Sequence, residues 1–360
     1  MNLDVFKENK AVTFLAALLL IAFIVAGVLT IVVSLEDDST SEPIEQVNER
    51  VVASDNDALN EYEPVKNSDA GSVNSADGKA AAAPVSKVWP EDKDPYKELD
   101  ALVGLGSVKE EVTSLVNFIK VQQAREKQGL KTTPISYHCV FTGNPGTGKT
   151  TVARIMAGIY KDLGILKRGH MVETDRSGLV AEYLGQTAVK TNAIIDSALG
   201  GVLFIDEAYA LAEKDDSYGY EAISTLLKRM EDDRDNLVVI VAGYTNEMKT
   251  FINSNPGLQS RFNRYIEFPD YNADELFEMY GRNLKKYDMK LDDDASEYLQ
   301  EHLNMVVQRK NRNFGNGRYV RNIFEKTLTA QANRLAASSG TISKEQLSRI
   351  TLDDVKNATK

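Results

Sequence analysis

The chain has 360 residues, which is enough for two ordinary domains and additional segments, and its formal net charge is −11. The negative charge is concentrated between residues 36 and 94, where 15 acidic and 5 basic residues give −10, so the remaining chain carries only −1. This balance argues against a basic face for a nucleic acid, and the single cysteine excludes an intramolecular disulfide.

Residues 1–10 form a short tail ahead of an apolar segment without charges, Ala11–Leu35. The 25 residues of this segment exceed the ~20 that a helix needs to cross the bilayer core. A cleaved signal peptide is the alternative, but its apolar region is usually ~7–15 residues long, and no clear small-x-small cleavage site follows here. We therefore expect a retained, single-pass transmembrane helix.

Residues 36–94 are rich in Ser, Asp, Asn, Glu and Ala, with scattered Pro and no sustained apolar periodicity. Such a composition buries too little apolar surface to fold, so we expect an acidic disordered linker. Trp89 is the exception, and we expect it to mark where the chain begins to dock on the folded part.

An α/β domain is predicted over residues 95–269. It opens with a helix in which the capping box Ser107–Glu110 precedes an apolar stripe, and Gly129 closes this helix. Strands are expected at Ser136–Thr142, His170–Thr174, Val202–Asp206, Leu237–Ala242 and Tyr265–Phe268, and helices from Thr151, at Thr187–Leu199 and at Tyr220–Glu231. Alternating strands and helices predict a parallel sheet with helices on both faces.

Residues 270–360 are predicted to form a small, all-helical second domain. The apolar periodicity indicates helices at Asp274–Tyr287, Asp292–Gln308 and Arg318–Ala337, followed by a short terminal piece.

The stretch between the first strand and its helix reads Gly-x-x-x-x-Gly-Lys-Thr, the phosphate-binding loop of nucleotide triphosphatases. Its glycines let the backbone wrap a phosphate with inward N–H groups, and the following helix directs its positive end at the same place. Lys149 is placed to reach the β- and γ-phosphates, and the Thr150 hydroxyl is a Mg²⁺ ligand. The predicted nucleotide-binding residues of this loop are Asn144, Pro145, Gly146, Thr147, Gly148, Lys149, Thr150 and Thr151.

Two carboxylates, Asp206 and Glu207, follow a run of four apolar residues. A buried strand would place both at the carboxyl end of the sheet, where nucleotides bind in open α/β folds. Asp206 is expected to hold Mg²⁺, and Glu207 to orient and activate the attacking water. An acidic strand end that caps the next helix is the alternative, and the phosphate-binding loop upstream favours the catalytic role.

Together these motifs resemble the AAA+ ATPases, and more closely the subfamily that contains red-type Rubisco activase and stage V sporulation protein K. The resemblance runs from about Leu99 to the C-terminus and leaves out the apolar segment and the acidic linker. It rests on the stretches Leu102–Leu105, Phe141–Thr150, Gly201–Tyr209, Val241–Tyr244, Ser254–Gly257, Phe268–Tyr271 and Arg318–Asn322.

This resemblance implies roles at the end of the α/β domain. Arg261 and Arg264 match the arginine fingers, which stabilise transition-state charge on the γ-phosphate bound to the neighbouring subunit. Surface arginines near a domain edge are the alternative. Asn246, or Thr245 before it, matches the polar sensor that helps to position the attacking water.

It also implies roles in the second domain and around the base. Arg318, or Arg321 one helical turn later, matches the second sensor, which couples the helical lid to the γ-phosphate. Val103 and Gly104 fall where this fold packs against adenine. Tyr183, next to a flexible glycine, matches the pore loop that grips a substrate chain in the ring's central channel, although a core tyrosine is the alternative.

The function implied by the resemblance is hydrolysis of ATP with Mg²⁺ by a homo-oligomeric ring, expected to be a hexamer, that remodels a protein or protein complex near a membrane. A nucleotide-gated membrane scaffold that threads no substrate is the alternative. A DNA-linked loader is disfavoured, because the chain lacks a basic face and no nucleic-acid partner is expected.

The orientation of the membrane helix is predicted by two arguments that conflict. Lys7 and Lys10 precede the helix and the first basic residue after it is Arg50, which favours export of the remaining chain. An ATPase needs cytosolic ATP, and two lysines beside two acidic residues are a weak signal. We therefore expect the ATPase domain to face the cytoplasm.

Overall fold

The computed structural model describes residues 86–360 except 134, 184, 214–215 and 339–340. The predicted membrane segment Ala11–Leu35 and the linker up to residue 85 lie outside the described residues. Within the part of the chain that is described, no helix is both long and apolar enough to cross a membrane.

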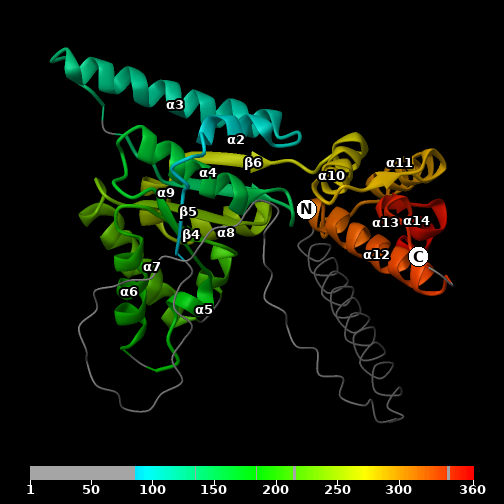
Figure 1. Cartoon of the computed structure of the whole chain (residues 1–360). Coiled ribbons are helices and arrows are strands. Elements are labelled where there is room, and N and C mark those ends of the chain that lie inside the picture. Colours follow the sequence, from blue (N-terminus) through cyan, green and yellow to red (C-terminus); the bar gives the residue numbers. More distant parts are fainter. Residues whose placement is uncertain (1–85, 134, 184, 214–215, 339–340) are drawn as a thin grey trace, which may run out of the picture. The chain divides into compact units, whose positions relative to one another are not determined.

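A six-stranded sheet forms the centre of the α/β domain (Figure 1). Its spatial order is β1-β3-β4-β5-β2-β6, and all neighbouring pairs are parallel except β1 with β3. The strands are β1 (Ser86–Val88), β2 (Cys139–Gly143), β3 (His170–Thr174), β4 (Val202–Ile205), β5 (Val238–Gly243) and β6 (Arg264–Phe268). The predicted parallel sheet is confirmed, and β1 is an addition to it.

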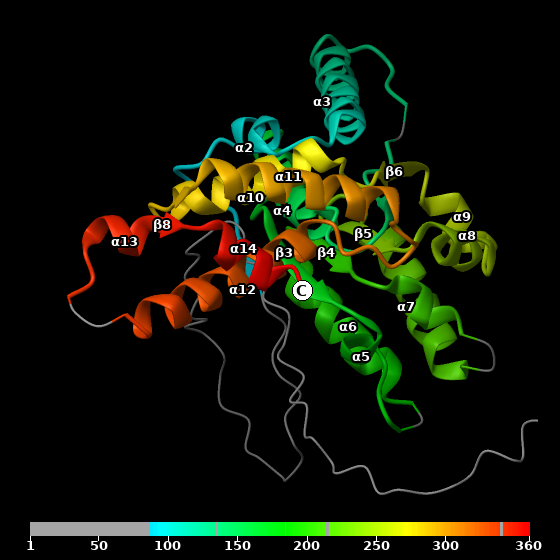
Figure 2. The same cartoon turned by 90° about the vertical axis from the view of Figure 1, so that its right-hand side faces the viewer.

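Helices cover both faces of this sheet (Figures 1 and 2). Successive strand side chains point to opposite faces, so Phe141 packs with α3 and α4 whereas Val140 packs with α6, α7 and α8. These helices are α3 (Gly106–Lys127), α4 (Lys149–Asp162), α6 (Thr187–Ala198), α7 (Ser217–Asp232) and α8 (Thr245–Asn253). Helix α8 and four shorter helices were not predicted; the shorter ones are α2 (Pro95–Ala101), α5 (Arg176–Leu179), the 3-10 helix η1 (Ala208–Ala212) and α9 (Pro256–Arg261).

The predicted start of α3, at the capping box Ser107–Glu110, lies too far along the chain. The helix begins at Gly106 after Leu105, which has φ 55° and gives no side-chain cap, so Ser107 lies inside the first turn. Leu105 takes this left-handed conformation while its side chain is buried. The predicted apolar stripe and the closing Gly129 are confirmed.

The predicted linker ends earlier than Asp94. Ser86–Val88 pairs with β3, and Trp89 is buried against α4 while its indole Nε1 donates to the Lys93 carbonyl at 2.7 Å. Gly158 makes room for the ring, because a Cβ there would lie 2.7 Å from the indole carbons. The expectation that Trp89 marks the docking point is confirmed.

We predict that Gly158→Ala destabilises the protein by about 1–3 kcal/mol, because the added methyl overpacks the indole site. Alanine normally stabilises a helix interior by about 0.5–1 kcal/mol relative to glycine. Trp89 is the only tryptophan, so its fluorescence should shift to the red in the variant. Gly281→Ala is the matched control: Gly281 is helical with open space around it, and this change should not destabilise.

The second domain contains five helices and a two-stranded parallel sheet among the described residues. They are α10 (Ala273–Lys286), α11 (Asp293–Gln308), α12 (Gly317–Ala336), α13 (Lys344–Ser348), α14 (Leu352–Ala358), β7 (Lys290–Leu291) and β8 (Arg349–Ile350). Helices α10, α11, α12 and α14 pack on one another around buried apolar side chains (Figures 1 and 2).

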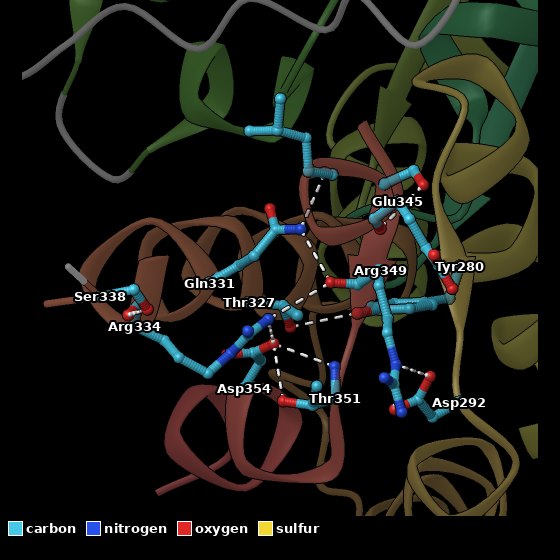
Figure 3. A network of polar contacts seen from close by, with 12 residues as sticks. Tyr280, Asp292, Thr327, Gln331, Arg334, Ser338, Glu345, Arg349, Thr351 and Asp354 are labelled. Carbon is cyan, nitrogen blue, oxygen red and sulfur yellow. Dashed lines mark hydrogen bonds and ion pairs between the residues drawn. The ribbon is translucent and has the colours of Figure 1, made fainter. Parts of the chain in front are cut away.

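A polar network joins α12 to the C-terminal end of the chain (Figure 3). Asp354 is buried and accepts from the Arg334 guanidinium at 2.9 and 2.7 Å and from the backbone and hydroxyl of Thr351, both at 2.9 Å. Gln331 donates to the carbonyls of Leu347 and Arg349 at 3.0 and 2.9 Å. Because a buried charge is retained only where it is paired and hydrogen-bonded, this network fixes α12, the helix that begins at the site described next.

Candidate nucleotide site

The phosphate-binding loop connects the fully buried strand β2 to α4. Its turn needs positive φ angles at Gly146 (68°) and Gly148 (94°), which glycine adopts without steric cost. Gly146 also has no room for a side chain, since a Cβ would lie 2.2 Å from the Gly315 carbonyl oxygen in the second domain. The glycines therefore serve both the phosphate cradle and the contact with that domain.

Lys149 is fixed at the mouth of this loop. Its ammonium donates to the carbonyls of Gly143 and Asn144, both at 2.9 Å. Burial lowers the pKa of Lys149 to about 8, with the charge of Asp206 opposing the shift and that of Arg318 adding to it. Asp206 and Arg318 line the same cavity as Lys149, and bound phosphates would favour the charged form of the ammonium.

A cavity of about 790 Å³ lies beside the loop and is large enough for a nucleotide. Its phosphate end is lined by Pro145, Gly146, Gly148, Lys149, Thr150, Thr151, Asp206, Glu207 and Arg318, as the sequence predicted. The side chains of Asn144 and Thr147 point elsewhere: Asn144 donates to Asp270 at 2.8 Å, and the Thr147 hydroxyl donates to the Asn144 carbonyl at 2.8 Å.

The two acids follow β4 at the carboxyl end of the sheet. Asp206 Oδ1 accepts from the Glu207 amide at 3.0 Å, and Glu207 is exposed with φ 47°, a conformation uncommon for a non-glycine residue. Asp206 and the Thr150 hydroxyl are the residues that fit Mg²⁺, which takes few protein ligands and relies on phosphates and water. Within the described residues, no cluster of three metal-binding side chains competes with this site.

The base side of the cavity combines one predicted residue with several that sequence reasoning missed. Val103 lines it, whereas Gly104 turns the backbone with φ 59° and faces Glu275. The missed lining residues are Leu105, Tyr271, Met279, Asn283, Tyr287 and Phe324. Met279, Asn283 and Phe324 lie on α10 and α12, where apolar periodicity cannot distinguish a residue that faces a cavity from one that faces the core.

The polar sensor predicted after the fourth predicted strand is placed differently. Gly243 and Tyr244 line the cavity, whereas Asn246 is exposed in the first turn of α8. Strand β5 ends one residue later than predicted, so Tyr244 is the residue that follows it. Thr245 and Asn246 are the first two residues of α8. Neither Asn246 nor its alternative Thr245 lines the cavity, and the sensor role of either residue stays a prediction.

Arg261 and Arg264 lie at the opposite end of the sheet from the phosphate-binding loop. Arg264 pairs with Cys139 at the start of β2, four residues before Gly143, which is roughly 13 Å along the strand. Neither arginine can reach the phosphates of its own subunit from there. This placement fits the predicted action on a neighbouring subunit.

The two arginines differ in how they are held. Arg264 lies over the Phe118 ring at 5.6 Å, a cation–π contact. Arg261 makes only long contacts, 3.5 Å to Glu231 and 3.4 Å to Ser260, and its Nε is buried without a partner. Neither guanidinium is held by a contact shorter than 3.4 Å among the described residues, so both remain candidates for the finger.

Tyr183 lies on an exposed loop between α5 and α6 with 67% of its side chain accessible, so it is not a core tyrosine. The loop is anchored at its base, because the Lys190 ammonium donates to the Ser177 and Val180 carbonyls at 2.6 and 2.9 Å. The Thr187 hydroxyl accepts from the Ala181 amide at 3.1 Å. These hydrogen bonds hold the base of the loop on which the exposed Tyr183 side chain lies.

A parallel α/β sheet with a phosphate-binding loop, a strand-end Asp–Glu pair and a helical lid defines a P-loop ATPase. Residues 139–270 match the ATPase family associated with various cellular activities (AAA), and residues 272–360 match the AAA lid domain. The chain is 45% identical to stage V sporulation protein K of Bacillus subtilis (strain 168), over 68% of this chain and 76% of that protein. It is 44% identical to Protein CbbX of Cereibacter sphaeroides, over 73% and 86% of the two chains.

Among solved structures, the FIGL-1 AAA domain in complex with ADP has the same fold, with a TM-score of 0.54 at 17% identity over 76% of this chain and 85% of that one. The chain belongs to the AAA ATPase family, and its activity is ATP hydrolysis.

Proposed function

We propose that this ATPase is anchored in a membrane, assembles as a hexameric ring and uses MgATP to remodel a protein or protein complex through its pore. The observation that carries the proposal is the division of the machinery between two ends of one domain. The phosphate-binding loop lies at one end of the sheet, and Arg261 lies at the other. A complete site then needs two subunits, as in a ring.

Different residues of this chain have different roles within such a site. The loop backbone and Lys149 would hold the β- and γ-phosphates, and Thr150 and Asp206 would hold Mg²⁺, which would supply positive charge at the phosphates. Glu207 orients and deprotonates the attacking water, and Arg318 from the lid approaches the γ-phosphate. The neighbour's Arg261 stabilises the charge that develops in the transition state.

We expect Tyr183→Ala to hydrolyse ATP within about twofold of the wild-type rate, because the side chain lies outside the nucleotide site. The same variant should no longer bind the client protein, because it lacks the exposed aromatic side chain. The measurement is recovery of membrane proteins, by mass spectrometry, on a Glu207→Gln variant with and without Tyr183→Ala. Tyr220→Ala, at an exposed tyrosine of α7, is the control. A Tyr183→Ala protein that keeps its recovered clients and its cellular function would favour the nucleotide-gated scaffold.

We further propose that Ala11–Leu35 is a retained transmembrane helix and that the ATPase domain faces the cytoplasm. The segment carries no charge and is long enough to span, and the nucleotide site requires cytosolic ATP. A C-terminal tag on sealed cells should resist external protease and become sensitive after permeabilisation. Digestion of the tag without permeabilisation would refute this orientation.

A further inference from the structure

Asp270 is the second residue after β6, at the junction between the α/β domain and the lid. Its Oδ1 accepts from the side-chain amides of Asn144 at 2.8 Å and Asn316 at 2.9 Å. Its Oδ2 lies 3.0 Å from the Lys310 ammonium. Asn144 belongs to the phosphate-binding loop, and Lys310 and Asn316 both belong to the connection between α11 and α12, so one carboxylate joins these two segments.

Asn316 is fully buried and has φ 47°, a conformation that a non-glycine residue keeps only where its surroundings impose it. Its Oδ1 accepts from the Tyr271 amide at 3.0 Å, and its Nδ2 also donates to the Pro145 carbonyl at 3.2 Å. The side chain therefore contacts the loop directly and again through Asp270.

The next residues extend the same junction. The Gly317 amide donates to the Gly146 carbonyl at 3.0 Å, and the Tyr271 hydroxyl donates to the Thr147 carbonyl at 3.1 Å. Each residue from Asn144 to Thr147 is thus hydrogen-bonded to a residue of the second domain. Arg318, which lines the phosphate end of the cavity, follows Gly317 immediately.

We propose that Asp270 is a positioning residue that couples the phosphate-binding loop to the lid: it fixes Asn144 and Asn316 together, and so sets the loop for phosphate and Arg318 for its approach to the nucleotide. Asp270 acts through these residues, since its own carboxylate is engaged with them. The inference deepens the proposed function, because it rests on the role given there to Arg318.

The charge of Asp270 suits this task. Burial alone would raise its pKa, but the hydrogen bonds from Asn316, Asn144 and Lys310 outweigh burial and hold the pKa below its usual range. An ionised carboxylate accepts from all three donors at once. An asparagine at this position would direct an amide N–H₂ group, which is a donor, at one of these three donors, so one hydrogen bond would be lost.

The test compares Asp270→Asn with wild type in the full-length protein. We expect the KM for ATP to rise about tenfold, as for the loss of one charge-assisted hydrogen bond, with kcat changed less than about threefold. Hydrogen exchange gives a second readout. ADP should slow exchange at both 143–151 and 314–321 in wild type, but only at 143–151 in Asp270→Asn.

Two further variants separate this role from general stability. Asn144→Ala should reproduce the rise in KM, and combining it with Asp270→Asn should add nothing, because both break the same link. Lys310→Met, which removes the most exposed partner, should stay within about twofold of wild type. If Asp270→Asn fails to fold, the exchange pattern of Asn144→Ala decides.

A wild-type KM together with ADP protection of both segments in Asp270→Asn, or in Asn144→Ala where the first does not fold, would overturn the proposal. Arg318→Ala distinguishes this failure from failure of the proposed function. Wild-type turnover by Arg318→Ala would refute the sensor role of that arginine. The coupling between the phosphate-binding loop and the lid would still be decided by hydrogen exchange in Asp270→Asn.

Discussion

A Glu207→Gln variant is expected to bind MgATP with near wild-type affinity and to hydrolyse it at least about 100-fold more slowly, the usual contribution of a general base. Glutamine keeps the size of the side chain but cannot take a proton from water. The phosphate contacts of Lys149 and the metal position at Asp206 remain. Binding is measured with a fluorescent ATP analogue, and turnover by phosphate release.

Two companion variants make this result specific. Lys149→Ala should lose binding as well as turnover, because the cation at the β- and γ-phosphates is gone. Glu213→Gln, an exposed carboxylate shortly after η1, should leave both quantities unchanged. Wild-type turnover by Glu207→Gln would show that another group activates the water.

The parts of this site that could be predicted from sequence are those that lie within one short segment. The phosphate-binding loop is a strand, a turn and a helix start in direct succession, and Asp206 and Glu207 directly follow a single buried strand. Local spacing therefore carries the chemistry. The five parallel strands were predicted for the same reason, because each is a short segment with apolar, β-branched or aromatic residues between helices.

The Asp270 junction could not be predicted this way. Its residues are 144, 270, 310 and 316, and no periodicity connects positions so far apart. The sequence marked Phe268–Tyr271 only as a family resemblance and as the end of a domain. The role of Asp270 depends on the contacts between the lid and the phosphate-binding loop, which form only in the folded protein.

The misplaced sensor shows how sensitive such predictions are to one strand boundary. A strand that ends at Gly243 instead of Ala242 brings Tyr244 to the cavity and leaves Asn246 on an exposed helical turn. Similarly, Leu105 in a left-handed conformation starts α3 before the capping box that the sequence suggested.

An Arg261→Ala variant is expected to bind ATP normally and to hydrolyse it about 1,000-fold more slowly, in the range of an arginine supplied by a neighbour. The side chain is far from its own subunit's phosphates, and its guanidinium has a buried Nε without a partner. Arg234→Ala, at a nearby exposed arginine, should be neutral. Arg264→Ala tests the alternative finger, which is held over Phe118 within the subunit.

Mixing two inactive variants distinguishes action between subunits from action within one. In a random mixture of Arg261→Ala and Lys149→Ala, one interface in four pairs an intact loop with an intact arginine, so about a quarter of the wild-type rate should return if interfaces act independently. An arginine that acts within its own subunit leaves every site defective, and the mixture stays inactive. No recovery in a mixture that forms rings, or full activity of a monomeric wild-type protein, would therefore refute the shared site and the ring-based mechanism with it.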